Sequence, residues 1–265
     1  MSPAEARLKE VPSTMTEAEW EQRVNLAAAY RLVALYGWDD LIDTHISARV
    51  PGPEHHFLIN PYGQFFGEIT ASSLVKIDLE GRAVEASPYP VNPAGFVIHS
   101  AIHGAREDAQ CVLHTHTKAG CAVAALKCGL LPVNQISMEF YGRVAYHDYE
   151  GVALDMSEQQ RLVQDLGDKT VLMLRNHGLL TVGETVSQAF LRMYYLEKAC
   201  EIQLAAQAAG EVILPPPEVC AHTERQFNDP GRPLEEGQLN DPDAMQLAWA
   251  ALIRMLDRVA PGYRD

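Results

Sequence analysis

The stretch CVLHTHTKAG, residues 111–120, places two histidines one residue apart at the end of an apolar run. Such a run predicts a buried strand, and alternate residues of a strand point to the same face of a sheet. His114 and His116 are therefore expected to reach one metal ion together. A stable metal site needs at least a third ligand. His177 is the candidate, because it stands at the tip of a predicted turn with Gly178 behind it. The alternative is a histidine pair that only faces solvent or is hydrogen-bonded in the core.

Other polar residues are candidates for the same pocket, and each has a structural alternative. His99 and His103 lie four residues apart on a predicted helix, which makes them a second possible ligand pair. Glu139 is either a metal ligand or general base, or a solvated loop carboxylate. His45 and His147 are either pocket groups or ordinary polar residues. Spacing alone does not choose between these alternatives.

Strands and helices interleave on both sides of the opening stretch. A capping box at Thr16 and Glu19 begins a helix that ends at Gly37. Short strands are predicted at 44–50, 56–60, 74–81, 109–116 and 142–149, and a hairpin at 169–183. Further helices are predicted at about 92–106, with Pro93 first, and at 118–129, 156–167, with Ser157 as cap, 185–209 and 243–260. The sequence shows no internal repeat and no clear linker, so it predicts one α/β domain.

The C-terminal part differs in composition from the rest. From residue 211 the chain is rich in Pro, Glu and Asp, which predicts an arm draped over a surface or a partner, followed by a docked helix. We therefore expect a tail at 1–14, the domain at 15–210, and an arm and helix at 211–265 that pack on a neighbouring copy. The segment EVILPPPEV, residues 211–219, exposes apolar residues without an obvious partner, which favours self-association.

The balance of charges excludes several classes of partner. The formal net charge is −14, from 35 acidic and 21 basic residues, which argues against nucleic acid and anionic membranes as partners. No run approaches the roughly 18 apolar residues of a membrane span, and the N-terminus has no stretch suited to a signal peptide. The five cysteines form no CxxC pair and are typical of reduced thiols, so a cytoplasmic protein is expected.

The chain from about residue 17 to residue 210 resembles the class II aldolase/adducin family. The resemblance rests on NPAGFVIHSAIHGARED, CVLHTHTKAGCAVAALKCGLLP, GRVAYHDYEG and LRNHGLLTVGE, and it is especially close to adducin head domains. In aldolases of this family an H-x-H pair and a histidine before glycine bind zinc, and these positions match His114, His116 and His177. The resemblance implies a three-layer α/β/α fold with a mixed, mainly antiparallel sheet. It also implies a homotetramer with active sites at subunit interfaces.

The chain departs from the sugar-phosphate aldolases where they bind phosphate. Those enzymes have Ser-Ser-Glu before the helix histidine, with the glutamate as acid/base, whereas this chain has Pro93-Ala94-Gly95. Their phosphate-loop Gly-Asn corresponds to Thr44-His45, and their proton-donating tyrosine falls near Gln135. The resemblance therefore implies a retained metal ion and a small substrate without a phosphate.

Three functions follow as hypotheses. The first is a metal-dependent carbon–carbon lyase, by retro-aldol cleavage or decarboxylation of a hydroxy or keto acid, with His45, Glu139 or Tyr141 moving the proton. The second is a non-haem Fe(II) oxygenase on a hydroxy or keto acid, and the third a non-catalytic, adducin-like association domain. Zinc is the first choice of metal, with Fe(II) or Mn as alternatives, because imidazole suits several of these ions.

Overall fold

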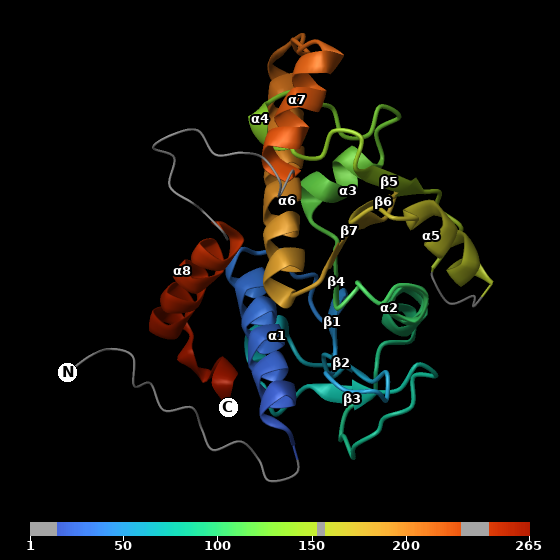
Figure 1. Ribbon diagram of the computed structural model, residues 1–265, viewed down its shortest axis with the longest axis vertical. Coiled ribbons are helices and arrows are strands. Elements are labelled where there is room, and N and C mark those ends of the chain that lie inside the picture. Colours follow the sequence, from blue (N-terminus) through green and yellow to red (C-terminus); the bar gives the residue numbers. More distant parts are fainter. Residues whose placement is uncertain (1–14, 153–156, 229–243) are drawn as a thin grey trace.

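The computed structural model describes residues 15–152, 157–228 and 244–265 (Figure 1). Within these residues, seven strands form one sheet in the order β3-β2-β1-β4-β7-β6-β5. Neighbouring strands are antiparallel except for the parallel pair β5 and β6. The strands are β1 (His45–Arg49), β2 (Phe57–Ile59), β3 (Val75–Ile77), β4 (Cys111–Thr115), β5 (Val144–His147), β6 (Val171–Leu174) and β7 (Gly178–Gly183).

Helices cover both faces of this sheet (Figure 1). One face packs against α1 and α6, on which α8 lies in turn, and the other packs against α2 and α5, with one main hydrophobic core on each side. A smaller cluster lies at β2 and β3. The helices are α1 (Glu17–Leu35), α2 (Pro93–Ala105), α3 (Lys118–Ala124), α4 (Gln135–Met138), α5 (Glu158–Leu166), α6 (Val186–Ala209), α7 (Pro217–Asn228) and α8 (Ala244–Val259), with 3-10 turns at Phe66–Glu68 and Pro261–Arg264. The expected three-layer α/β/α fold with a mixed, mainly antiparallel sheet is confirmed. None of the described helices is long and apolar enough to cross a membrane.

The alternation of side chains along the central strands decides which residues face α2. In β4, Leu113 packs in the core beneath α1 and α6, whereas Val112 packs in the core beneath α2 and α5. His114 follows Val112 by two residues and therefore points to the α2 side. In β1 the same alternation sends His45 and Ser47 to that side. The sheet thus gathers several imidazole and hydroxyl groups under one helix.

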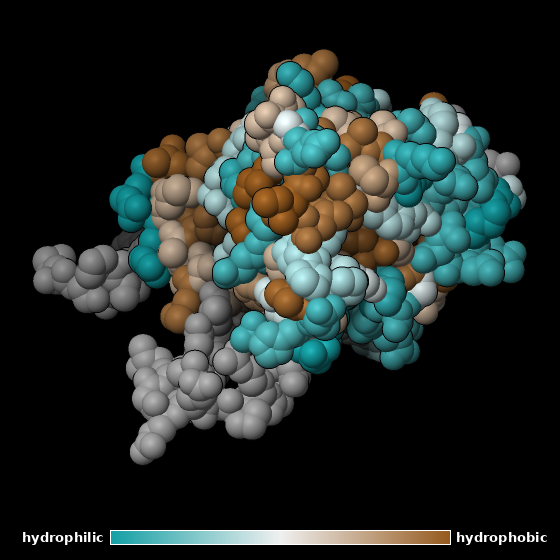
Figure 2. Space-filling model, turned by 90° about the horizontal axis from the view of Figure 1, so that it is seen from above, coloured by the Kyte–Doolittle hydropathy of each residue, from teal (hydrophilic) through white to brown (hydrophobic). Residues whose placement is uncertain are grey.

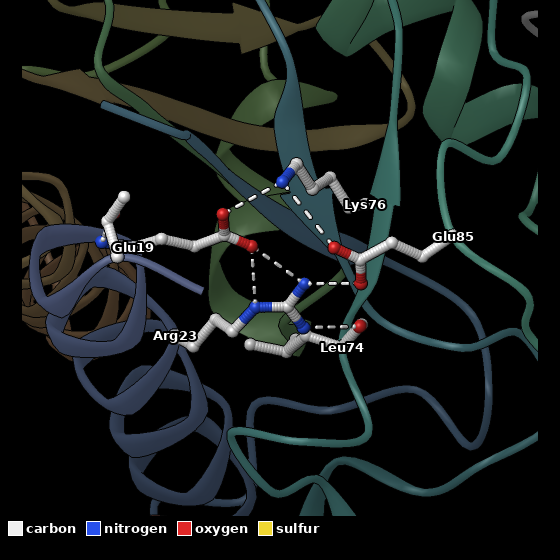
Figure 3. A network of polar contacts seen from close by, with 6 residues as sticks. Glu19, Arg23, Leu74, Lys76 and Glu85 are labelled. Carbon is white, nitrogen blue, oxygen red and sulfur yellow. Dashed lines mark hydrogen bonds and ion pairs between the residues drawn. The ribbon is translucent and has the colours of Figure 1, made fainter. Parts of the chain in front are cut away.

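A buried network of charges ties α1 to the edge of the sheet (Figure 3). The guanidinium of Arg23 donates to the carboxylate of Glu19 and to the carbonyl of Leu74, and it pairs with Glu85 at 2.9 Å. Lys76 of β3 also pairs with Glu19, at 2.8 Å. Burial alone would raise the pKa of Glu19, but the hydrogen bonds from Lys76 and Arg23 outweigh it and hold that pKa below its ordinary value. The network ties the start of α1 to β3.

Most predicted elements are present, with shifted ends. Thr16 caps α1 by accepting from the amide of Glu19 at 3.1 Å, and Pro93 is the first residue of α2. The predicted helix at 118–129 ends earlier, at Ala124, and Ser157 makes no capping hydrogen bond with its side chain. The tail at 1–14 and the later part of the arm, at 229–243, lie outside the described residues.

The C-terminal region differs from the prediction in two ways. Residues 217–228 form α7, where an extended arm was expected, and this helix packs beside α4, a single turn that was not predicted. The last helix, α8, was expected to pack on a neighbouring copy. It lies against α1 and α6 of its own chain, with its Leu256 buried in their core together with Tyr263 of the 3-10 turn that follows.

Candidate metal centre

Three histidines meet where β4 ends and β7 begins. His114 lies in β4, His116 follows the last residue of that strand, and His177 precedes the first residue of β7. The two strands are paired, so these ends lie side by side. The Nε2 atom of His116 lies 2.9 Å from Nε2 of His114 and 3.0 Å from Nε2 of His177. In the part of the chain that the structure describes, this is the one group of three or more His, Cys, Asp or Glu side chains whose ligand atoms all lie within 4.8 Å of one another.

The outer nitrogens of two of these rings are held by acceptors. Nδ1 of His114 lies 2.8 Å from the carbonyl oxygen of Leu179, and Nδ1 of His116 lies 3.1 Å from a carboxylate oxygen of Asp40. An oxygen of either kind can only accept, so each Nδ1 carries the proton and each neutral ring has a bare Nε2. Two lone pairs therefore face each other across 2.9 Å, and they repel unless a proton or a cation lies between them.

Burial disfavours the proton. It lowers the pKa of His177 to about 4, with the neighbouring His116 and His147 adding to the effect. Burial, and then His177, His116 and His45, hold the pKa of His114 well below its ordinary value. Neutral imidazoles with converging nitrogens are the form that binds a divalent ion. The donor set therefore fits a metal with three histidine ligands.

Gly178 makes this convergence possible. A Cβ atom at that position would lie 2.4 Å from the carbonyl oxygen of Thr115, and 3.2 and 3.3 Å from the rings of His116 and His114. Asn176, two residues earlier, adopts a left-handed conformation with φ of 57°. The Asn-His-Gly sequence is thus a turn that brings His177 against β4 without a side chain in the way.

His45 lies beside the cluster in space that a side chain at position 95 would need. It is paired with His114 across β1 and β4, with ring centroids 5.3 Å apart. A Cβ atom on Gly95 would lie 2.9 Å from Cγ and Nδ1 of the His45 ring. Burial, and then His116 and His177, lower the pKa of His45 to about 3, so its ring is neutral at neutral pH. Among the described residues neither ring nitrogen has a hydrogen-bond partner.

The second histidine pair of α2 does not form a metal site with the first. His99 and His103 both contact the hydroxyl of Ser47, at 2.5 and 2.7 Å. Nδ1 of His103 donates a hydrogen bond to the carbonyl oxygen of Ala109, at 2.8 Å. The His99 ring packs edge-on against His45 with centroids 4.4 Å apart. The pair is therefore part of a hydrogen-bonded chain that runs behind His45.

Comparison with known families shows which one the chain belongs to. Residues 24–204, more than half of the chain, match the family model for the class II aldolase and adducin N-terminal domain. The chain belongs to the class II aldolase and adducin family. Family members of this kind include aldolase-type lyases, and the shared fold suggests that activity for this chain.

Relatives from this family cover nearly the whole chain. A Caulobacter vibrioides protein assigned provisionally to aldolase class 2 is 55% identical over 95% of this chain and 95% of its own length. Rat α-adducin is 46% identical over 91% of this chain, which corresponds to 33% of adducin. Among solved structures, an aldolase II superfamily protein from Pseudomonas syringae has 54% identity and a TM-score of 0.88, covering 96% of this chain and 99% of that one. L-fuculose 1-phosphate aldolase from Glaciozyma antarctica has 32% identity and a TM-score of 0.80, covering 97% and 98%.

Glu139 and Tyr141, predicted for the same pocket, lie elsewhere in this class II aldolase-like chain. Glu139 ends α4, and burial raises its pKa to about 7, with Arg192 and Arg143 opposing the shift. Tyr141 lines a separate hollow together with Arg143. The structure thus brings His45 to the histidine cluster and leaves the other two outside it within one chain.

Two residues that hold histidine nitrogens were not predicted from the sequence, and the role of a third residue, His147, was left undecided. Asp40 and Ser47 hold histidine nitrogens, and neither was predicted, because a carboxylate or hydroxyl gains this role only through strand pairing. Ser47 did carry a signal, since it lies two residues from His45 on the same face of β1. His147 points away to Asp165 and Glu158, at 2.8 and 3.3 Å, and so is a buried polar residue with its own partners.

Proposed function

We propose that this protein is a metal-dependent carbon–carbon lyase that cleaves a small hydroxy or keto acid without a phosphate, by retro-aldol reaction or decarboxylation. One observation carries the proposal: His114, His116 and His177 direct their Nε2 atoms at one point, and the first two rings are held there as bare acceptors. A divalent ion bound by these three residues supplies a Lewis acid for a carbonyl and its neighbouring oxygen.

His45 is the proton-handling residue of this proposal. Its neutral ring can accept a proton from a substrate hydroxyl at one nitrogen, while the other nitrogen keeps its N–H. A buried imidazole with a lowered pKa stays neutral at neutral pH, so this nitrogen remains an acceptor. The ring occupies the space beside position 95, where the sugar-phosphate aldolases have their acid/base glutamate.

The absence of a phosphate from the substrate follows from the same positions. Pro93, Ala94 and Gly95 replace the Ser-Ser-Glu of the sugar-phosphate aldolases and offer no hydroxyl for a phosphate. The similarity to an enzyme named for L-fuculose 1-phosphate supports the reaction type in this proposal and not its substrate. Zinc is the first choice of metal, since three histidines and an open position suit it, with Fe(II) or Mn as alternatives.

The similarity to adducin favours a second candidate, a non-catalytic association domain. Rat α-adducin matches 91% of this chain at 46% identity. A domain used only for association does not require unprotonated histidine nitrogens that face one another. The measured metal content therefore distinguishes the lyase from the association domain.

The deciding experiment combines metal analysis with turnover. The protein is purified without added metal, its metal content is measured, and it is then assayed with a panel of hydroxy and keto acids for cleavage products and for oxygen uptake. We expect about one zinc or manganese ion per chain and cleavage without oxygen uptake. Iron with oxygen uptake would instead identify an oxygenase, and neither metal nor turnover would leave the association domain.

The proposal includes assembly into a homotetramer in the cytoplasm. The segment between α6 and α7 exposes Ile213 by 89% and Leu214 by 46%. Figure 2 looks down on this end of the molecule and shows apolar side chains gathered over it. Three of the five cysteines are buried free thiols, which supports a reducing compartment.

A further inference from the structure

Several buried polar atoms beside the histidine cluster lack hydrogen-bond partners among the described residues. They are both ring nitrogens of His45, Nε2 of His99 and the hydroxyl of Thr44. Buried polar groups are nearly always paired, so each orphan of this kind calls for an explanation. His99 and His45 have their orphaned nitrogens on neighbouring rings.

The direction of the hydrogen bonds behind His99 follows from one backbone carbonyl. The carbonyl of Ala109 can only accept, so Nδ1 of His103 carries the proton and its Nε2 is bare. That bare Nε2 accepts the O–H of Ser47, at 2.7 Å. The oxygen of Ser47 in turn accepts N–H from Nδ1 of His99, at 2.5 Å. A neutral His99 therefore has a bare Nε2, fixed as an acceptor by a chain of four groups.

The ring of His45 lies next to the ring of His99, whose Nε2 is this acceptor. It packs edge-on against His99, and Gly95 leaves room for it there. An imidazole N–H is a donor, and His45 has one that is unused. A hydrogen bond from His45 to Nε2 of His99 would give a partner to one nitrogen of each ring.

We propose that Ser47, His99 and His103 are positioning residues that set the tautomer of His45: the chain from the Ala109 carbonyl makes His99 an acceptor, His99 takes the N–H of His45, and the other nitrogen of His45 is left bare toward the three-histidine cluster. In terms of the proposed lyase, on which this inference rests, His45 then meets the substrate as an acceptor and so favours a substrate group that carries a proton, such as a hydroxyl.

The test observes the ring nitrogens directly. Zinc is added to protein labelled with ¹⁵N-histidine, and long-range ¹H–¹⁵N spectra distinguish protonated from bare nitrogens, with single substitutions assigning His45 and His99. We expect His99 to be protonated at Nδ1 and bare at Nε2, and His45 to show one fixed tautomer.

Two variants and a matched control test the series of hydrogen bonds from the Ala109 carbonyl to His99. His103→Phe keeps the ring that packs 5.0 Å from Phe57 but removes the acceptor for Ser47, whose O–H is then free to donate to Nδ1 of His99. A fraction of His99 should then carry its proton on Nε2, and the His45 pattern should change with it. Ser47→Ala should likewise leave both rings as mixtures of tautomers. Ser100→Ala removes a buried hydroxyl of α2 that contacts Gln159 and lies outside the chain, so it should change neither ring.

Either of two results overturns the proposal: a His99 protonated at Nε2 in the unmodified protein, or a His45 pattern that stays unchanged when Ser47→Ala or His103→Phe alters His99. If one variant fails to fold, the other still gives this result. Failure of the proposed lyase activity would appear separately, as missing metal or missing turnover, because the spectra need no substrate.

Discussion

At the scale of single residues, the missing side chain at position 95 decides what lies beside the histidine cluster. Gly95→Ala would place a Cβ atom 2.9 Å from the His45 ring, so the variant should displace His45 and lose stability. Overpacking of this kind costs about 1–3 kcal/mol, which urea denaturation measures. Gly104→Ala is the matched control on the same helix, since a Cβ atom there meets nothing within 4 Å. Equal stability of the two variants would contradict a contact between position 95 and His45.

His116 contacts both other members of the cluster and is the residue to remove for the metal site. His116→Ala should abolish stoichiometric metal, as measured by elemental analysis, while the far-ultraviolet circular dichroism stays unchanged. The fold should survive because the side chain is already 25% exposed. His222→Ala removes an exposed histidine of α7 and should keep its metal. Full metal occupancy in the His116 variant would refute the ligand assignment.

The sequence predicted the positions of these histidines better than their surroundings. The H-x-H spacing on a strand and the Asn-His-Gly turn depend on local geometry, which a sequence shows. The place of His45 beside Gly95 depends on how β1 meets α2, which no local pattern reveals. Glu139 was expected in the pocket because of its type and nearby motifs, and the structure puts it under α7 instead.

At the scale of elements, the attachment of α1 to β3 depends on Arg23. Arg23→Leu leaves Glu19 buried with only Lys76 and should cost about 3–5 kcal/mol, as found when one partner of a buried ion pair is removed. Urea denaturation followed by fluorescence measures the change. Arg82→Ala is the control, because this arginine is 73% exposed and pairs with Asp78 on the surface, so its loss should have little effect. A small effect of Arg23→Leu would show that the network does not hold the helix.

The same network makes stability sensitive to acid. The pKa of Glu19 lies below its ordinary value of 4.5 in the folded chain, so the unfolded chain takes up a proton first as the pH falls. The contribution of Glu19 is therefore complete above that value and is lost progressively as the pH drops toward the folded pKa. Unfolding free energies measured between pH 3 and pH 6 should fall over this range, and Glu19→Gln should fall less steeply. Identical slopes would assign the acid sensitivity to other carboxylates.

Elements with local signals were predicted and those without them were missed. Helix α1 has a cap at Thr16 and a stop at Gly37, and α2 has a proline at its first position. The proline run at 215–217 suggested an arm, yet Pro217 is the first residue of α7, a position where proline is compatible with a helix. The single turn α4 is too short for periodicity to show.

At the scale of the whole molecule, the end formed by α6 and α7 is expected to meet another copy. Ile213→Asp places a charge on the exposed apolar segment and should weaken association, which sedimentation velocity at micromolar concentration measures. Val84→Asp is the control, because Val84 is also exposed, at 43%, and its amide donates to the carbonyl of Lys76 in β3. Strand β3 lies at the opposite end of the molecule from α7 (Figure 1). A monomeric unmodified protein, or equal association of both variants, would contradict the proposed assembly.

The strand order has a consequence for how the histidine cluster comes into being during folding. β1, β4 and β7 are adjacent in space but are separated along the chain by β2, β3, α2, β5 and β6. Contacts between distant segments form slowly, because the chain must lose the entropy of a long loop before these contacts can stabilise it. No hairpin or helix contains the complete ligand set, so a partly folded chain offers an ion at most two neighbouring ligands. Tight metal binding would therefore show that β4 and β7 have paired. A metal ion added during refolding would stabilise the folded chain and would not change the early folding steps.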